Sequence, residues 1–214
     1  MTQICNRLVH SLTVLAAALT LTGCLVPETI DADVAINGYS YEMNVSSRLG
    51  YARALQVLAD GKTLSEKDEA ELRSEERKSE GMPGFQTFKY VGDGRYDLVI
   101  QLDGSLAENG TAIGIPNTKT KSRKNNFLTI QRTEDGLMTI SSPQIGDEMR
   151  KQLESFGIVP KGNVQVTVKS GKVLDHNAKN QSGFFGTFVG SDPEYSWDIL
   201  SWADRIFISI DPNG

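Results

Sequence analysis

Few side chains of this sequence could act as nucleophiles, bases or metal ligands. The 214 residues include two cysteines, Cys5 and Cys24, and two histidines, His10 and His176. A zinc or other imidazole-rich metal site needs several clustered nitrogen or sulfur ligands, so we expect no metal site of that type. A Ser-His-Asp arrangement could use His176, but the sequence has no Gly-x-Ser-x-Gly elbow, and Asp175 should not face the neighbouring imidazole. We predict a turn position for His176 and no catalytic residue.

Carboxylates are the remaining reactive groups, with 27 Asp and Glu side chains. A paired-acid hydrolase acting on glycans stays open as a weaker alternative, because nothing in the sequence selects a pair. Gly92-Asp93-Gly94 is too short and too turn-like to bind a nucleotide. No phosphate loop, dinucleotide fingerprint or calcium loop is present, so we expect no cofactor.

An apolar run near the N-terminus ends in Leu21-Thr22-Gly23-Cys24. The run begins at Leu12, after a single basic residue, and is too short to be a permanent membrane helix. These four residues resemble the lipobox of bacterial lipoproteins. The resemblance implies cleavage between Gly23 and Cys24, diacylglycerol on the Cys24 thiol and acylation of the new amine. The alternative is an ordinary signal peptide or an N-terminal membrane helix that contains a cysteine.

A lipidated Cys24 would decide both the location and the thiol chemistry of the mature chain. Two or three acyl chains on one residue detach very slowly, whereas one chain holds only marginally. The next residue is Leu25, not the Asp of inner-membrane retention. We expect the periplasmic side of the outer membrane in a Gram-negative host and the outer face of the cytoplasmic membrane otherwise. Cys5 would leave with the signal, so no disulfide would support the domain.

Size and charge limit the function classes further. Removing residues 1–23 leaves 191 of the 214 residues, which we divide into a tether at 24–29 and one domain at 30–214. Arg7 is the only charged residue removed, so the net charge changes from −5 to about −6. Nucleic-acid binding needs a basic surface and is not expected. The sequence contains no second apolar run of about twenty residues, so lipid is the expected membrane attachment.

Alternating apolar residues predict three hairpins. They cover residues 30–36 with 39–45 across Asn37-Gly38, 88–90 with 96–102 across Gly92-Asp93-Gly94, and 127–132 with 137–141 across Glu134-Asp135-Gly136. In the first hairpin, Ile36 should face Tyr39. Further strands are expected at 164–168, 195–200 and 206–210, and a short one at 112–115 inside a long loop.

Helical spacing predicts helices at 49–58 and 65–79 and a third that starts at Ser142-Pro143 and ends at Gly157. The second is highly charged, with Glu69 placed to pair with Arg73. Helices and hairpins in separate blocks indicate an α+β fold with a mainly antiparallel sheet and two or three helices. Such a fold could enclose an apolar pocket.

Two segments are candidate contacts for a ligand or a membrane. Lys119, Lys121, Arg123 and Lys124 form a basic cluster that could meet anionic head groups, although a solvated loop explains it as well. Phe184, Phe185 and Phe188 stand among glycines and could line a pocket mouth, or could be buried under the sheet.

The C-terminal section resembles the end of LppM-type lipoprotein domains. The shared pattern is the strand Val164-Gln165-Val166-Thr167-Val168, then Ser170-Gly171-Lys172-Val173, then His176-Asn177-Ala178, then Tyr195-Ser196-Trp197-Asp198-Ile199. The resemblance implies an α+β domain with an apolar lumen that binds lipid or glycolipid in the envelope. The charged run at 66–80 is longer than the pattern needs, and members often continue into a C-terminal membrane helix.

The sequence therefore favours a non-enzymatic, lipid-anchored envelope protein that binds a lipid or other amphiphile. An alternative is a structural lipoprotein that binds another envelope protein through the charged helix or an open sheet edge.

Overall fold

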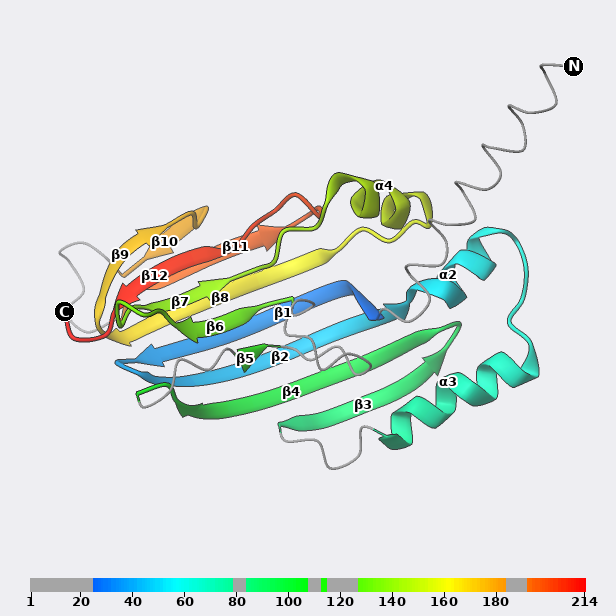
Figure 1. Ribbon diagram of the computed structural model, residues 1–214, viewed down its shortest axis with the longest axis horizontal. Helices are drawn as coiled ribbons and strands as arrows, with labels where there is room; N and C mark the ends of the chain where they lie inside the picture. Colours follow the sequence, from blue (N-terminus) through cyan, green and yellow to red (C-terminus); the bar gives the residue numbers. More distant parts are fainter. Residues whose placement is uncertain (1–24, 79–83, 108–112, 115–126, 184–191) are drawn as a thin grey trace, which may run out of the picture.

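The structure, a computed structural model, describes residues 25–78, 84–107, 113–114, 127–183 and 192–214. Within these residues the chain forms two β-sheets that face each other, with three helices around them (Figure 1). Both sheets are mostly antiparallel, which confirms the predicted α+β class.

The larger sheet has seven strands in the order β10-β11-β8-β1-β2-β4-β3. Its strands are β1 (Leu25–Asn37), β2 (Ser40–Tyr51), β3 (Phe85–Gly92), β4 (Arg95–Ser105), β8 (Lys161–Ser170), β10 (Asn180–Ser182) and β11 (Glu194–Ile199). β1 pairs antiparallel with β2 and parallel with β8, where Ile36 lies beside Val168. The parallel pair was not predicted, because alternation identifies a buried face but not a strand's partner.

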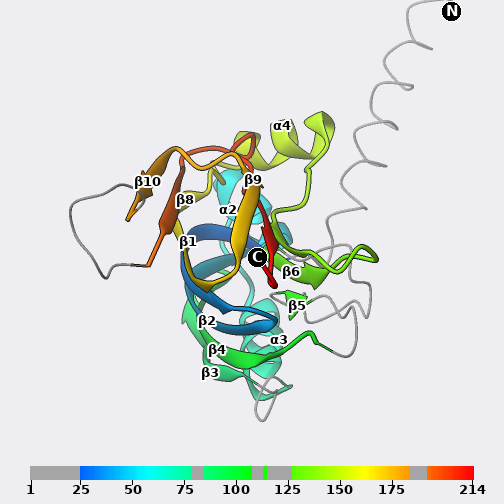
Figure 2. The ribbon, with the colours of Figure 1, turned by 90° about the vertical axis from the view of Figure 1, so that its left-hand side faces the viewer.

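The smaller sheet has the order β5-β6-β7-β12-β9. It consists of β5 (Ile113–Gly114), β6 (Thr129–Arg132), β7 (Met138–Ser141), β9 (Lys172–His176) and β12 (Phe207–Asp211). Viewed from one end, the larger sheet curves around the smaller one (Figure 2). The alternating apolar residues of both sheets point into the space between them and form one core. Its fully buried members include Ile30, Ile36, Ile100, Leu128, Ile130, Met138, Ile140, Val164, Val166, Ile208 and Ile210.

The helices are α2 (Ala52–Ala59), α3 (Glu66–Lys78) and α4 (Asp147–Ser155). α2 and α4 lie at the end of the molecule where β1 begins (Figure 1). The predicted charged helix, α3, packs against β3 and β4: its Leu72 is buried and accepts a hydrogen bond at the backbone from the Tyr96 hydroxyl at 2.8 Å. The predicted Glu69–Arg73 ion pair is present at 3.8 Å. α3 is thus a mostly solvated helix fixed to the sheet by few contacts.

The tether predicted at residues 24–29 is wrong for its described part, because β1 already begins at Leu25. Glu28 accepts two hydrogen bonds from the Arg95 guanidinium, at 2.9 and 3.1 Å. Thr29 accepts hydrogen bonds at its carbonyl from the Ser47 hydroxyl and at its hydroxyl from the Arg48 N–H. These contacts keep Glu28 and Thr29 in the sheet, although this part of the sequence shows no apolar alternation.

The first hairpin is confirmed, but its register differs from the prediction. Asn37 pairs with Ser40 and Ile36 with Tyr41, so the turn consists of Gly38 and Tyr39. Gly38 has φ of +60°, whereas Tyr39 does not have a positive φ. The observed turn needs a glycine only at its first central position, which Gly38 occupies. It is therefore favoured over the predicted turn, in which Asn37 would occupy that position. The pairing of β1 with β2 is shifted by two residues from the predicted one, so the alternating apolar residues of both strands still lie on one face of the hairpin.

Two predicted helix starts are also wrong. Leu49 belongs to β2, opposite Tyr96, and the backbone N–H of Tyr51 donates to the Gly94 carbonyl, so α2 starts only at Ala52. Ser142 does not cap a helix. Its hydroxyl accepts from the Ile206 N–H and its own N–H donates to the Ile206 carbonyl, which ties it to the start of β12.

The parallel β1–β8 pair leaves no room for a side chain at residue 162. Gly162 has φ of +151°, and a Cβ there would overlap the Ile30 carbonyl oxygen. We predict that Gly162→Ala lowers the free energy of unfolding by about 2–3 kcal/mol through overpacking, measured by urea unfolding of a soluble Cys24→Ala form. Gly146→Ala is the control, because a Cβ at Gly146 meets nothing within 4 Å. Equal effects of the two substitutions would contradict this account of the β1–β8 contact.

Candidate functional site

An open groove lies where the chain crosses from the larger to the smaller sheet. The crossing is at Gly171, between β8 and β9, where φ is +114° and a Cβ would lie 2.8 Å from the Asp211 carbonyl oxygen. The groove has a volume of about 440 Å³ and is lined by Val168, Gly171, Lys172, Val173, Leu174, His176, Pro193, Tyr195 and Gly214. A volume of this size falls within the range of small-molecule sites. We call it the crossover groove.

Most of the crossover groove is apolar. Leu174 is 50% exposed, and Val173 packs partly against the main core. The His176 ring contacts the Tyr195 ring edge-on, with centroids 4.8 Å apart, and joins the two sheets at the groove wall. Burial raises the pKa of the Tyr195 hydroxyl. Lys172 supplies a positive charge, and no Asp or Glu is among the lining residues.

His176 is the last residue of β9, opposite Ile208, so the predicted turn position is wrong. Its Nδ1 accepts the backbone N–H of Ala178 at 3.2 Å. Within the described residues no serine or carboxylate side chain is hydrogen-bonded to this imidazole, and Asp175 is exposed next to it. The geometry gives His176 a packing role.

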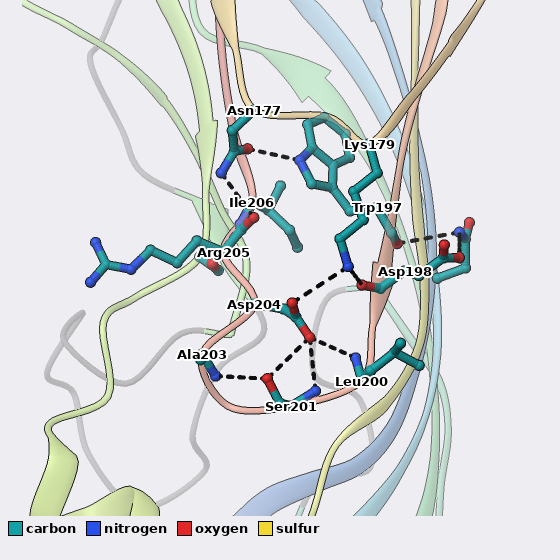
Figure 3. A network of polar contacts seen from close by, with 12 residues as sticks. Asn177, Lys179, Trp197, Asp198, Leu200, Ser201, Ala203, Asp204, Arg205 and Ile206 are labelled. Carbon is teal, nitrogen blue, oxygen red and sulfur yellow. Dashed lines mark hydrogen bonds and ion pairs between the residues drawn. The ribbon is translucent and has the colours of Figure 1, made fainter.

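A polar network beside the groove fastens β11 to β12 (Figure 3). The side-chain oxygen of Asn177 accepts the indole N–H of Trp197 and the backbone N–H of Phe207, both at 2.8 Å, and its amide donates to the Arg205 carbonyl at 3.1 Å. Because its oxygen and its amide are both engaged within the fold, Asn177 is a structural residue.

Asp204 holds the loop between β11 and β12 (Figure 3). One carboxylate oxygen accepts the backbone N–H groups of Leu200 and Ser201 at 2.8 Å and the Ser201 hydroxyl at 3.2 Å. Burial alone would raise the pKa of Asp204, but these hydrogen bonds and the ammonium of Lys179 outweigh it and hold the pKa below its usual value. The ionised carboxylate therefore fixes the position of Leu200.

A smaller pocket of about 90 Å³ lies between α2 and α3, where Arg53 faces the helix that carries Asp68, Glu71 and Glu75. Asp68 caps the start of α3: it accepts from the Ser65 N–H and hydroxyl, and its own N–H donates to the Ser65 hydroxyl. The Ser65 hydrogen bonds lower the pKa of Asp68. A general acid needs the opposite shift, so the pocket offers no support to the hydrolase alternative through Asp68.

The other predicted site residues lie outside the described part of the chain. These are the processing residues Gly23 and Cys24, the basic cluster Lys119, Lys121, Arg123 and Lys124, and the aromatic set Phe184, Phe185 and Phe188. Among the residues that are described, no three His, Cys, Asp or Glu side chains come together as a metal site. No helix in that same part of the chain is long and apolar enough to cross a bilayer.

Sequence reasoning missed the crossover groove. One signal was available: Val173 and Leu174 are consecutive apolar residues in a strand whose residues alternate between faces, so one of them had to point away from the core.

Comparison with protein-family models gave no match, and comparison with curated protein sequences gave none either. The resemblance to LppM-type domains therefore stays a prediction.

The Asp204 network predicts a pH-dependent stability. Hydrogen bonds to a charged group contribute about 1.5–3 kcal/mol, so we expect Asp204→Asn to cost about 1–2 kcal/mol at neutral pH. A carboxylate with a lowered pKa stabilises the fold above its unfolded pKa of about 3.9. The difference between the two proteins should then shrink as pH falls below that value. Urea unfolding at neutral and acidic pH measures it.

The exposed Asp175 provides the control, and Asp175→Asn should change stability little at either pH. An Asp204→Asn cost that stays constant down to low pH would show that the carboxylate charge is not what holds the loop.

Proposed function

We propose that this protein is a non-enzymatic, lipid-anchored protein of the bacterial cell envelope, whose crossover groove binds the apolar chain of a lipid or other amphiphile. The observation that carries the proposal is an open groove of about 440 Å³ whose apolar lining consists of the exposed Leu174, the half-buried Val173 and Pro193, and the buried Val168 and Tyr195. Removing such side chains from water on binding is favourable, at about 25 cal/mol per Å².

The lining also suggests the kind of head group. Lys172 stands at the groove beside apolar residues, with no Asp or Glu side chain in the lining. An amphiphile would match this lining if its anionic head group lay near Lys172 and its acyl chain lay along Val173 and Leu174.

The position of the groove supports a binding role away from the membrane surface. Ile36 of β1 lies beside Val168 at the groove, eleven residues after Leu25, which is about 35 Å along a strand. If Cys24 carries the lipid anchor, the groove opens toward the aqueous envelope. The bound amphiphile would then be held out of the bilayer to which the protein is attached.

Native mass spectrometry of a soluble Cys24→Ala form, incubated with an anionic lysophospholipid, tests the proposal. We expect a one-to-one adduct that Leu174→Glu weakens about tenfold, since losing a leucine contact of about 1.5 kcal/mol changes an affinity by that factor. Leu200→Glu is the matched control, because Leu200 is also an exposed leucine but lies outside the groove. Absence of the adduct, or equal weakening by both substitutions, would refute the groove as the binding site.

A further inference from the structure

The end of the domain next to residue 24 has its own small apolar cluster. Val26, the second residue of β1, packs there with residues of α2 and α4 and with the segments around Ile158 and Trp202. The buried members are Val26, Ala52, Leu55, Leu153, Ile158 and Trp202, and Leu58, Ile145 and Phe156 are half-buried against them. This cluster is separate from the main core between the sheets.

Exposed apolar side chains gather around this cluster. Leu200 is 65% exposed, Met149 40% and Val159 36%; we call these three residues the end patch. Leu200 follows Ile199, which pairs with Gly162 of β8. Val159 comes two residues before Lys161, which pairs with Thr29 of β1. Met149 lies on α4, one turn from Leu153, which belongs to the same cluster as Val26. The other two exposed large apolar side chains among the described residues are Leu174 at the crossover groove and Val91 on β3.

Hydrogen bonds fix the backbone at or beside two residues of the end patch. Asp204 accepts the Leu200 N–H at 2.8 Å, and the indole N–H of Trp202 donates to the Ile158 carbonyl at 2.8 Å, one residue before Val159. Exposure of these side chains is therefore a property of an ordered surface. An ordered apolar surface open to solvent is typical of an interaction site.

The start of β1 indicates what covers the patch. Leu25 is the first strand residue, so a single peptide bond, about 3.8 Å between Cα atoms, separates the sheet from the predicted lipid on Cys24. With its acyl chains in a bilayer, residue 24 would hold this end of the domain at the head groups. We propose that the end patch inserts into the head-group region of the anchoring membrane, so that the domain stands with β1 pointing away from the bilayer.

The contact would be apolar rather than electrostatic. α4 carries Asp147, Glu148 and Glu154 against Arg150 and Lys151, and Arg150 is paired with Asp147 at 3.1 Å. A helix with this balance has no net attraction for anionic lipid. Docking should therefore occur on neutral phosphatidylcholine and should persist at high salt.

This inference rests on the anchoring at Cys24 that the proposed function includes, and the test supplies that anchor chemically. Cys24 is the only thiol in residues 24–214, so it can be coupled to a maleimide phospholipid in phosphatidylcholine nanodiscs. A photocrosslinking benzoylphenylalanine replaces Leu200 in one protein and Asn37, which is exposed at the other end of β1, in the control. We expect at least tenfold more crosslinking to phospholipid from position 200 than from position 37, at low and high salt.

A short attachment alone could orient the domain, so a second comparison isolates the end patch. Met149→Ser with Val159→Ser, in the protein with the probe at position 200, should lower the phospholipid crosslinking severalfold. Equal crosslinking from positions 200 and 37, an unchanged yield in the double variant, or crosslinks from position 200 mainly to a second copy of the protein would each overturn the proposal. If the crossover groove does not bind an amphiphile, that result would appear only in the mass-spectrometric adduct measurement, which uses no membrane.

Discussion

Pairing of β1 on both of its edges is the constraint from which the rest of the structure follows. β1 pairs antiparallel with β2 from Leu25 to Asn37 and parallel with β8 from Thr29 to Asn37. Thirteen residues of strand span about 40 Å. Because β1 is central, its first residues define one end of the molecule, with α2, α4 and the end patch, and its last residues define the other, with the crossover groove.

Single polar side chains hold the connecting segments at these two ends. Glu28 binds Arg95 where β1 begins, Asn177 joins β11 to β12, and Asp204 supports the loop that carries Leu200. Glu28 and Asn177 bond to groups 20 or more residues away, whereas Asp204 bonds mainly to Leu200 and Ser201 in its own loop. A partly buried polar group must have such partners, and here the partners are what place a loop in a defined position. The apolar residues left exposed by these loops are therefore displayed on ordered surfaces.

Local patterns in the sequence predicted the parts of the fold that depend on neighbouring residues. Alternation identified the buried faces of Val164, Val166 and Val168, and glycine turns identified the hairpins. The β1–β8 pair, the start of β1 at Leu25 and the contact of Ser142 with Ile206 could not be predicted, since each depends on residues far apart in the chain. The crossover groove was missed for the same reason: Val168, Leu174 and Tyr195 meet only after the sheets have formed.

The intact mass of the full-length protein, extracted in detergent from the cells that produce it, tests the central claim most directly. Both the proposed location and the orientation of the domain depend on a lipid at residue 24, immediately before β1. The account predicts the mass of residues 24–214 plus a diacylglyceryl group and an amide-linked acyl chain, with Cys24→Ala abolishing the modification. A chain that retains residues 1–23, or a processed chain with a free Cys24 thiol, would contradict it.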